Sequence, residues 1–157
     1  MLKLKKEAKT KGDLIVFIKD THEEESVEFK RFGNTKHCVR GTSEGELVDE
    51  LKPYENDEDA VSIEKNSTSF MEANDFRNLL FLNPEIEEID VVGCCTDICV
   101  VNGTVGLANY MNQHNLDVDI RVHQDAVATY NEEARGNYVD AAFLLMEQQG
   151  IQLVKKK

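Results

Sequence analysis

Three of the four cysteines in the sequence lie within six positions, in the stretch VVGCCTDICV at residues 91–100. Cysteines gathered in this way can form a metal site, a disulfide, a buried structural position or a nucleophile. Cys94, Cys95 and Cys99 follow the spacing CCxxxC, which lacks the CxxC pair typical of structural zinc. Adjacent cysteines rarely bridge each other, and the basic start of the chain has no signal-peptide core, which indicates a reducing compartment. A nucleophile and a buried structural cysteine remain open.

Cys99 is expected in the first turn of a helix. The segment IEEIDVV at 86–92 predicts a strand that ends at Gly93, and residues 96–114 have the apolar spacing of a helix that Thr96 or Asp97 would cap. The free backbone N–H groups and the positive dipole end of a helix stabilise a thiolate there. The same groups can hold a developing oxyanion. A buried structural cysteine remains the alternative.

Lys65 closes the predicted strand AVSIEK at residues 60–65. The carboxyl ends of parallel strands meet at one edge of a sheet, so Lys65 would face the same edge as Cys99. A lysine there can hold a carboxylate or favour a thiolate. A solvated lysine is the alternative.

The segment DTHEEESVEFKRFGNTKHC, which begins at Asp20, carries the residue types of a metal site. Asp20 and His22 point to the same side of an extended chain, because side chains alternate along a strand. A carboxylate with the imidazoles of His22 and His37 suits a borderline divalent metal with open positions. Glu28, in the predicted loop at 21–42, is the candidate fourth ligand. A polar loop with incidental histidines is the alternative.

Strand and helix patterns alternate along the chain, which predicts an α/β protein with a mostly parallel sheet. Ligands of such proteins bind beyond the carboxyl ends of the strands. Strands are predicted at 14–20, 60–65, 86–93, 117–122 and 151–154, and helical segments at 2–11, 43–51, 74–81, 96–114 and 131–149.

The composition limits the classes of partner. With 157 residues, 41% hydrophobic and 31% charged, the chain has the size and balance of one soluble globular domain. The net charge of −12 repels nucleic acid and anionic membranes. Its apolar runs are far shorter than the ~20 residues that a membrane span needs. We therefore predict a cytoplasmic protein that acts on small molecules, without nucleic-acid or membrane partners.

These separate motifs together resemble those of the isochorismatase-like cysteine hydrolases, and within them the nicotinamidases. GCCTDICV resembles the signature segment of that family. Matches in the same order run along nearly the whole chain: DTH at 20–22, the EF pair at 28–29, HC followed by GT, EK followed by SF, and DAVAT at 125–129.

The resemblance implies a doubly wound parallel sheet with helices on both faces, a Rossmann-like three-layer sandwich. It implies that Cys99 is the nucleophile and that Lys65 belongs to a Cys–Asp–Lys triad. It also implies a cis peptide bond between Cys94 and Cys95, which aims the Cys95 N–H, with that of Cys99, at an oxyanion.

The resemblance further assigns one divalent ion, Zn, Mn or Fe, to Asp20, His22 and His37, with Glu28 as the variable fourth ligand. Phe70 and Phe32 resemble aromatics that pack on a substrate ring. The implied reaction is deamidation of nicotinamide, or a similar small amide, to the acid and ammonia through a Cys99 thioester, a step of NAD salvage. Family members commonly oligomerise; the sequence has no interface signature, so self-association stays open.

The family's triad aspartate lies on a strand before the first helix, whereas this sequence begins within what resembles that helix. We therefore expect a single domain over 1–157 that is short at its N-terminus and has impaired activity. Two other functions stay open: a related hydrolase of another small amide or an isochorismate-like ester, and a non-catalytic binding scaffold.

Overall fold

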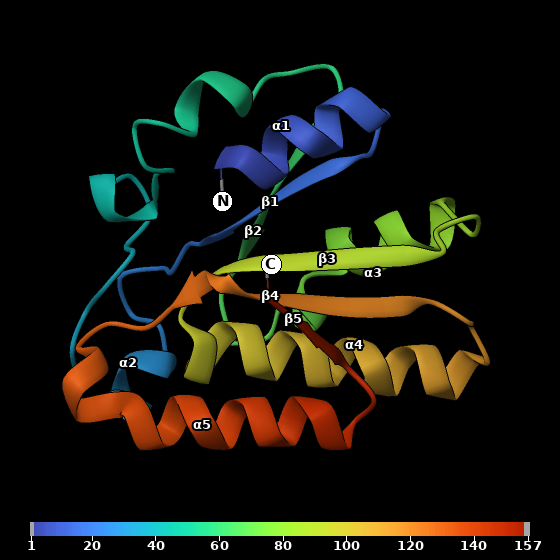
Figure 1. Ribbon diagram of the computed structural model, residues 1–157. Helices are drawn as coiled ribbons and strands as arrows, with labels where there is room; N and C mark the ends of the chain where they lie inside the picture. Colours follow the sequence, from blue (N-terminus) through green and yellow to red (C-terminus); the bar gives the residue numbers. More distant parts are fainter. Residues whose placement is uncertain (1, 156–157) are drawn as a thin grey trace. The chain divides into compact units, whose positions relative to one another are not determined.

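Figure 1 shows the computed structural model, which describes residues 2–155. The chain divides into two compact units, Met1–Ser67 and Thr68–Lys157. Each unit contains its own small parallel sheet, and we describe the two units in turn.

The first unit is organised around a parallel pair of strands. β1 pairs with β2 from Ile15 opposite Ala60 to Asp20 opposite Lys65. Phe17 of β1 and Ile63 of β2 are both buried, and because Ile63 pairs with Ile18 and not with Phe17, the two side chains lie on opposite faces of the pair. This register brings Asp20 and Lys65 together where both strands end. The elements are α1 (Leu2–Lys11), β1 (Ile15–Asp20), α2 (Glu28–Arg31), two 3₁₀ turns (Ser43–Gly45 and Lys52–Tyr54) and β2 (Ala60–Lys65).

Helix α1 is tied to the acidic turn before β2. The Lys5 ammonium is buried, lies 2.9 Å from an Asp57 carboxylate oxygen and 3.3 Å from the Tyr54 ring centroid. Lys9 reaches the same Asp57 oxygen at 2.7 Å. Lys5 and Lys9 are four residues apart and lie on the same side of α1. Their ion pairs with Asp57 therefore fix which side of α1 faces the rest of the unit.

The predicted helix at 43–51 is wrong. Within this range, only Ser43–Gly45 is helical, as a single 3₁₀ turn. The residue before it, Thr42, donates its hydroxyl to Val39 O at 2.7 Å and does not cap a helix. A glycine at the third position adds backbone entropy to an already costly helix nucleus, which explains the failure. The predicted loop at 21–42 contains the short helix α2.

The second unit is built on three parallel strands in the order β3–β4–β5. Figure 1 shows α4 and α5 lying side by side along this sheet. Val122, Leu107 and Met146, from β4, α4 and α5, are fully buried and form its centre. The elements are a 3₁₀ turn (Phe70–Glu72), α3 (Asn74–Leu82), β3 (Glu88–Cys94), a π-helical turn (Thr96–Val100), α4 (Val101–His114), β4 (Asp119–Ala128), α5 (Glu132–Gln148) and β5 (Gln152–Val154).

Strand β4 is longer than the predicted 117–122. The polar residues HQD at 123–125 interrupt the apolar pattern, yet the strand continues to Ala128. A register shift between Val91 and Gly93 lets the longer strand stay paired, with Cys94 opposite Ala128. The DAVAT segment is thereby placed beside the cysteines.

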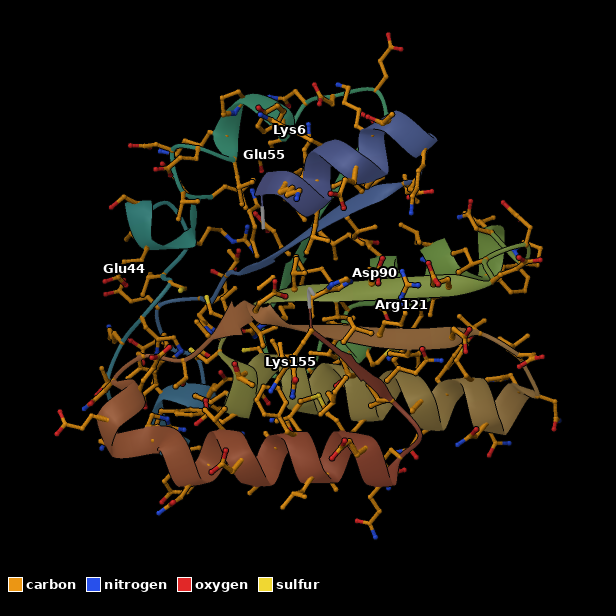
Figure 2. All side chains as sticks on the ribbon, viewed as in Figure 1. Lys6, Glu44, Glu55, Asp90, Arg121 and Lys155 are labelled. Carbon is orange, nitrogen blue, oxygen red and sulfur yellow. The ribbon has the colours of Figure 1, made fainter. Side chains whose placement is uncertain are left out.

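A charged cluster covers neighbouring positions of β3 and β4. Figure 2 shows Asp90 and Arg121 side by side, and their two hydrogen bonds measure 2.8 and 2.7 Å. His123 Nε2 lies 2.8 Å from the same carboxylate. His123 is thereby engaged in a cross-strand network.

The α/β class with parallel strand pairing is confirmed. Within residues 2–155, hydrogen-bonded ladders between named strands join β1 to β2 and β3 to β4 to β5. No helix in that range is both long and apolar enough to span a membrane.

Two glycines in helices of the second unit should respond oppositely to alanine. A Cβ at Gly103 would lie 2.1 Å from Cε1 of the buried Phe70, whereas a Cβ at Gly136 meets nothing within 4 Å. We expect Gly103→Ala to destabilise the protein by about 1–3 kcal/mol through overpacking. Gly136→Ala should stabilise it by about 0.5–1 kcal/mol, because alanine loses less entropy in a helix. Urea unfolding of both variants beside wild type measures this, and equal midpoints would contradict the packing described.

Candidate functional site

In the first unit, Asp20, His22 and His37 place one potential ligand atom each within 4.8 Å of one another. Asp20 ends β1, and His22 follows two residues later. The loop returns because Cys38 O accepts a hydrogen bond from His22 N–H at 2.9 Å, and His22 O accepts one from Arg40 N–H at 2.8 Å. This bridge brings His37 back to the end of β1. These three residues and Glu28 together are called the metal-ligand cluster.

The distances inside the metal-ligand cluster are too long for hydrogen bonds. His22 Nε2 lies 3.6 Å from Asp20 Oδ1 and 3.7 Å from Glu28 Oε1, and His37 Nε2 lies 3.9 Å from the same Glu28 oxygen. The His22 side chain is wholly buried, and within the described residues 2–155 its Nε2 has no hydrogen-bond partner. A buried polar atom without a partner requires an explanation. Two imidazoles and two carboxylates form a donor set that fits a divalent ion.

Lys65 is buried, so it is not the solvated lysine that the sequence left open. Its ammonium forms an ion pair with Asp20 Oδ1 and donates to Ser67 O at 2.8 Å. The Asp20 carboxylate therefore lies between Lys65 and the other members of the metal-ligand cluster. This pairing follows from the register of the two strands, in which Asp20 and Lys65 are direct partners.

In the second unit, Cys94, Cys95 and Cys99 lie between the end of β3 and the start of the helical stretch. The Cys94–Cys95 peptide bond is cis, the form that the resemblance implies. Cys95 O accepts hydrogen bonds from Ile98 N–H and Val100 N–H at 3.1 and 3.0 Å, which starts the helical turn. Cys99 is half-buried in that first turn. All three are free thiols, as is Cys38, so a disulfide does not explain their grouping.

The thiol of Cys95 has a lowered pKa. A side-chain hydrogen bond with Cys94 is the main factor that lowers its pKa, from 9.0 to about 6. Burial opposes this, while the backbone of Tyr130 and the side chain of Thr129 add to the lowering. This lowering favours the thiolate form of Cys95 at neutral pH, a property that the sequence motif did not reveal.

The alkylation of Cys95 should depend on pH in a way that Cys94 controls. A thiol with a lowered pKa stays reactive as the pH falls, until the pH passes below that pKa. We expect half-maximal labelling of Cys95 by iodoacetamide near pH 6, and a clearly higher midpoint in Cys94→Ala. Peptide mass spectrometry with fragmentation would assign each label, with Cys38 as the reference thiol. An unchanged midpoint in Cys94→Ala would remove Cys94 as the cause.

The sequence patterns did not predict a buried ion pair between Asp97, in the cysteine turn, and Arg135. The Asp97 side chain is 1% exposed, and Arg135 Nε and Thr129 Oγ1 donate to it at 2.7 and 2.5 Å. Burial raises the pKa of Asp97, but these two donors outweigh it and hold the pKa below its usual value. Arg135 also packs over Tyr130, 4.7 Å from the ring centroid. The pair joins the cysteine turn to α5, and Thr129, directly after the end of β4, contacts the same carboxylate. Arg135 does not belong to any of the motifs found in the sequence.

The two predicted substrate-binding aromatics have different surroundings. Phe70 is buried, lies against Gly103, and packs edge-on to Phe76 with ring centroids 4.9 Å apart. Phe32 is 37% exposed and lies edge-on to His37 at 6.0 Å. Phe32 is thereby placed beside the metal-ligand cluster, whereas Phe70 contributes to the core of the second unit.

Comparison with known proteins gives these clusters a family context. Residues 1–156 match the model of the isochorismatase domain. The chain belongs to the isochorismatase family. The isochorismatase family protein PncA of Bacillus subtilis (strain 168) is 31% identical over 140 residues, which cover 85% of this chain and 72% of that protein.

Solved structures of family members resemble the fold closely. The nicotinamidase PncA from Bacillus subtilis has a TM-score of 0.79 at 27% identity, covering 97% of this chain and 80% of the other. A pyrazinamidase of Pyrococcus horikoshii in complex with zinc has a TM-score of 0.73 at 28% identity, covering 96% and 80%. The predicted isochorismatase-like, nicotinamidase-type resemblance is therefore confirmed, and with it the α/β fold.

Proposed function

We propose that this isochorismatase-family chain is a metal-dependent cysteine amidase that converts nicotinamide and water to nicotinic acid and ammonia. The observation that supports it best is the metal-ligand cluster. Within the described residues, the buried Nε2 of His22 has no hydrogen-bond partner there, although the candidate donor atoms of the other three residues surround it. Related cysteine hydrolases outside the nicotinamidases often lack this ligand set, so the cluster favours a nicotinamide-type amide.

Cys99 is the proposed nucleophile. Its thiolate attacks the carboxamide carbon, and backbone N–H groups of Cys95 and Cys99 hold the negative charge on the oxygen. The proton that left the Cys99 thiol passes to the amide nitrogen, the C–N bond breaks, and ammonia leaves. Water hydrolyses the resulting thioester, which releases nicotinic acid and restores the thiol.

The first unit supplies the other proposed groups. Lys65 is the triad lysine, and its buried ion pair with Asp20 holds it in place. The metal-ligand cluster would hold one divalent ion, Zn, Mn or Fe, which when bound would orient the substrate through its pyridine nitrogen. Phe32 and Phe70 are proposed to contact the aromatic ring of the substrate.

The cellular setting is part of the same proposal. We place the activity in the cytoplasm, in NAD salvage, with residues 1–157 acting as a single domain on a small-molecule substrate.

Ammonia release from nicotinamide by the purified 157-residue chain, with added divalent metal, tests the function. A steady release that needs metal supports the proposal. Release from another small amide or ester, but not from nicotinamide, would keep the hydrolase and replace the substrate. A folded, metal-bound chain that releases no product from any of them would overturn catalysis and favour a binding scaffold.

A further inference from the structure

His22 is held from the side opposite the metal-ligand cluster. Its Nδ1 lies 2.7 Å from the side-chain oxygen Oδ1 of Asn66, the residue that directly follows Lys65. An amide oxygen only accepts hydrogen bonds, so the ring proton of His22 must lie on Nδ1. The lone pair of a neutral imidazole is then on Nε2.

A second contact supports the orientation in which the Asn66 amide oxygen faces His22. Ser26 Oγ lies 3.2 Å from the same Oδ1 and also accepts the backbone N–H of Glu28 at 3.4 Å. The Ser26 hydroxyl proton is therefore the one available to the Asn66 oxygen. Two donors, from His22 and Ser26, converge on this oxygen, which disfavours the flipped amide.

The opposite edge of the His22 ring faces the other candidate ligands. In the part of the chain that the structure describes, Nε2 is buried without a hydrogen-bond partner, 3.6 Å from Asp20 Oδ1 and 3.7 Å from Glu28 Oε1. A ligating histidine in metalloproteins usually donates its second ring N–H to an oxygen acceptor, which sets the tautomer and the ring orientation. Asn66 meets this description.

We propose that Asn66 is a positioning residue of the metal site, whose side-chain oxygen keeps the proton of His22 on Nδ1 and its Nε2 lone pair toward Asp20 and Glu28. This inference rests on the metal site of the proposed function. Asn66 adjoins Lys65 at the end of β2, and Thr21 N–H donates to Lys65 O at 2.8 Å. The end of one strand thus supports both His22 and, through Lys65, Asp20.

Two variants separate the acceptor from the size of the side chain. Asn66→Leu keeps a similar volume without an acceptor, and Asn66→Asp keeps an oxygen at the same position. Asn66 is exposed, so both should fold. We expect Zn²⁺ affinity, measured by calorimetry on the full chain, to fall about tenfold to a hundredfold in Asn66→Leu and to stay near wild type in Asn66→Asp. Asn56→Leu is the control for an asparagine elsewhere in this unit.

Nitrogen-15 NMR of the metal-free chain gives an independent measurement, because it reports which ring nitrogen of His22 carries the proton. We expect the Nδ1–H form in wild type and Asn66→Asp, and a mixture of forms in Asn66→Leu. Wild-type affinity and an unchanged tautomer in Asn66→Leu would overturn the proposal. A wild-type chain that binds no Zn²⁺, yet shows the Asn66-dependent tautomer, would overturn the metal site while supporting the role of Asn66 toward His22.

Discussion

Cys99→Ala should abolish ammonia release from nicotinamide. The substitution removes the sulfur that forms the thioester, and alanine offers no other nucleophile at that position. Loss of a nucleophile in a catalytic triad lowers turnover by about a thousandfold or more. Steady-state ammonia release, measured with saturating metal and nicotinamide, checks this, beside circular dichroism to show that the half-buried helical turn still forms.

Two thiols serve as controls for this experiment. Cys38→Ala removes a thiol whose Sγ lies 3.5 Å from Glu44 O and should keep full activity. Cys95 is the sharper comparison, because its lowered pKa favours the thiolate form at neutral pH. If Cys99→Ala kept its activity while Cys95→Ala lost it, the nucleophile would be Cys95, and the proposed role of Cys99 would be wrong.

His37→Ala should remove most of the affinity for divalent metal. It deletes one of four donors, and we expect Zn²⁺ to bind more than about a hundredfold more weakly, beyond the usual effect of a residue that only supports a ligand. His37 is a better choice than His22, because its side chain is 32% exposed and His22 is fully buried. The truncation should therefore perturb packing less. Calorimetric titration of the metal-free chain measures the affinity.

Thermal unfolding provides a second measurement of the same site. A ligand that binds only the folded chain stabilises it, by about 2.7 kcal/mol at a free concentration of about one hundred times Kd. Added Zn²⁺ should therefore raise the midpoint of wild type but hardly that of His37→Ala. His123→Ala, in the Asp90–Arg121 cluster, is the control that should retain the metal response. Equal metal responses in wild type and His37→Ala would show that the ion binds elsewhere.

Local patterns in the sequence predicted several parts of the fold and of the candidate site. The strand segment before Gly93 and the helical spacing after Thr96 placed Cys99 in a first helical turn, and the structure has that turn. The DxH spacing placed Asp20 and His22 on one side of the chain, and they lie in one cluster. Each of these predictions depends on residues within a few positions of one another, where side-chain periodicity is reliable.

The predictions that were wrong or missing have two physical causes, one local and one that depends on residues far apart in the chain. The 43–51 helix failed because weak local signals did not outweigh the cost of nucleation. Strand β4 continues past its polar residues because β3 pairs with it through a register shift. The cysteine motif gave no sign that Thr129 and Tyr130 contact Cys95.

The sequence by itself determined the parallel α/β class, the cysteine turn and the types of residue in the metal-ligand cluster. Only the tertiary structure decided how these residues are held in place. The side-chain contacts that hold them join residues 45, 44 and 38 positions apart: Lys65 with Asp20, Asn66 with His22, and Arg135 with Asp97. The reason is physical. Side-chain periodicity depends on the local backbone, whereas these contacts depend on strand register and on where a loop returns, which the packing of the whole unit sets.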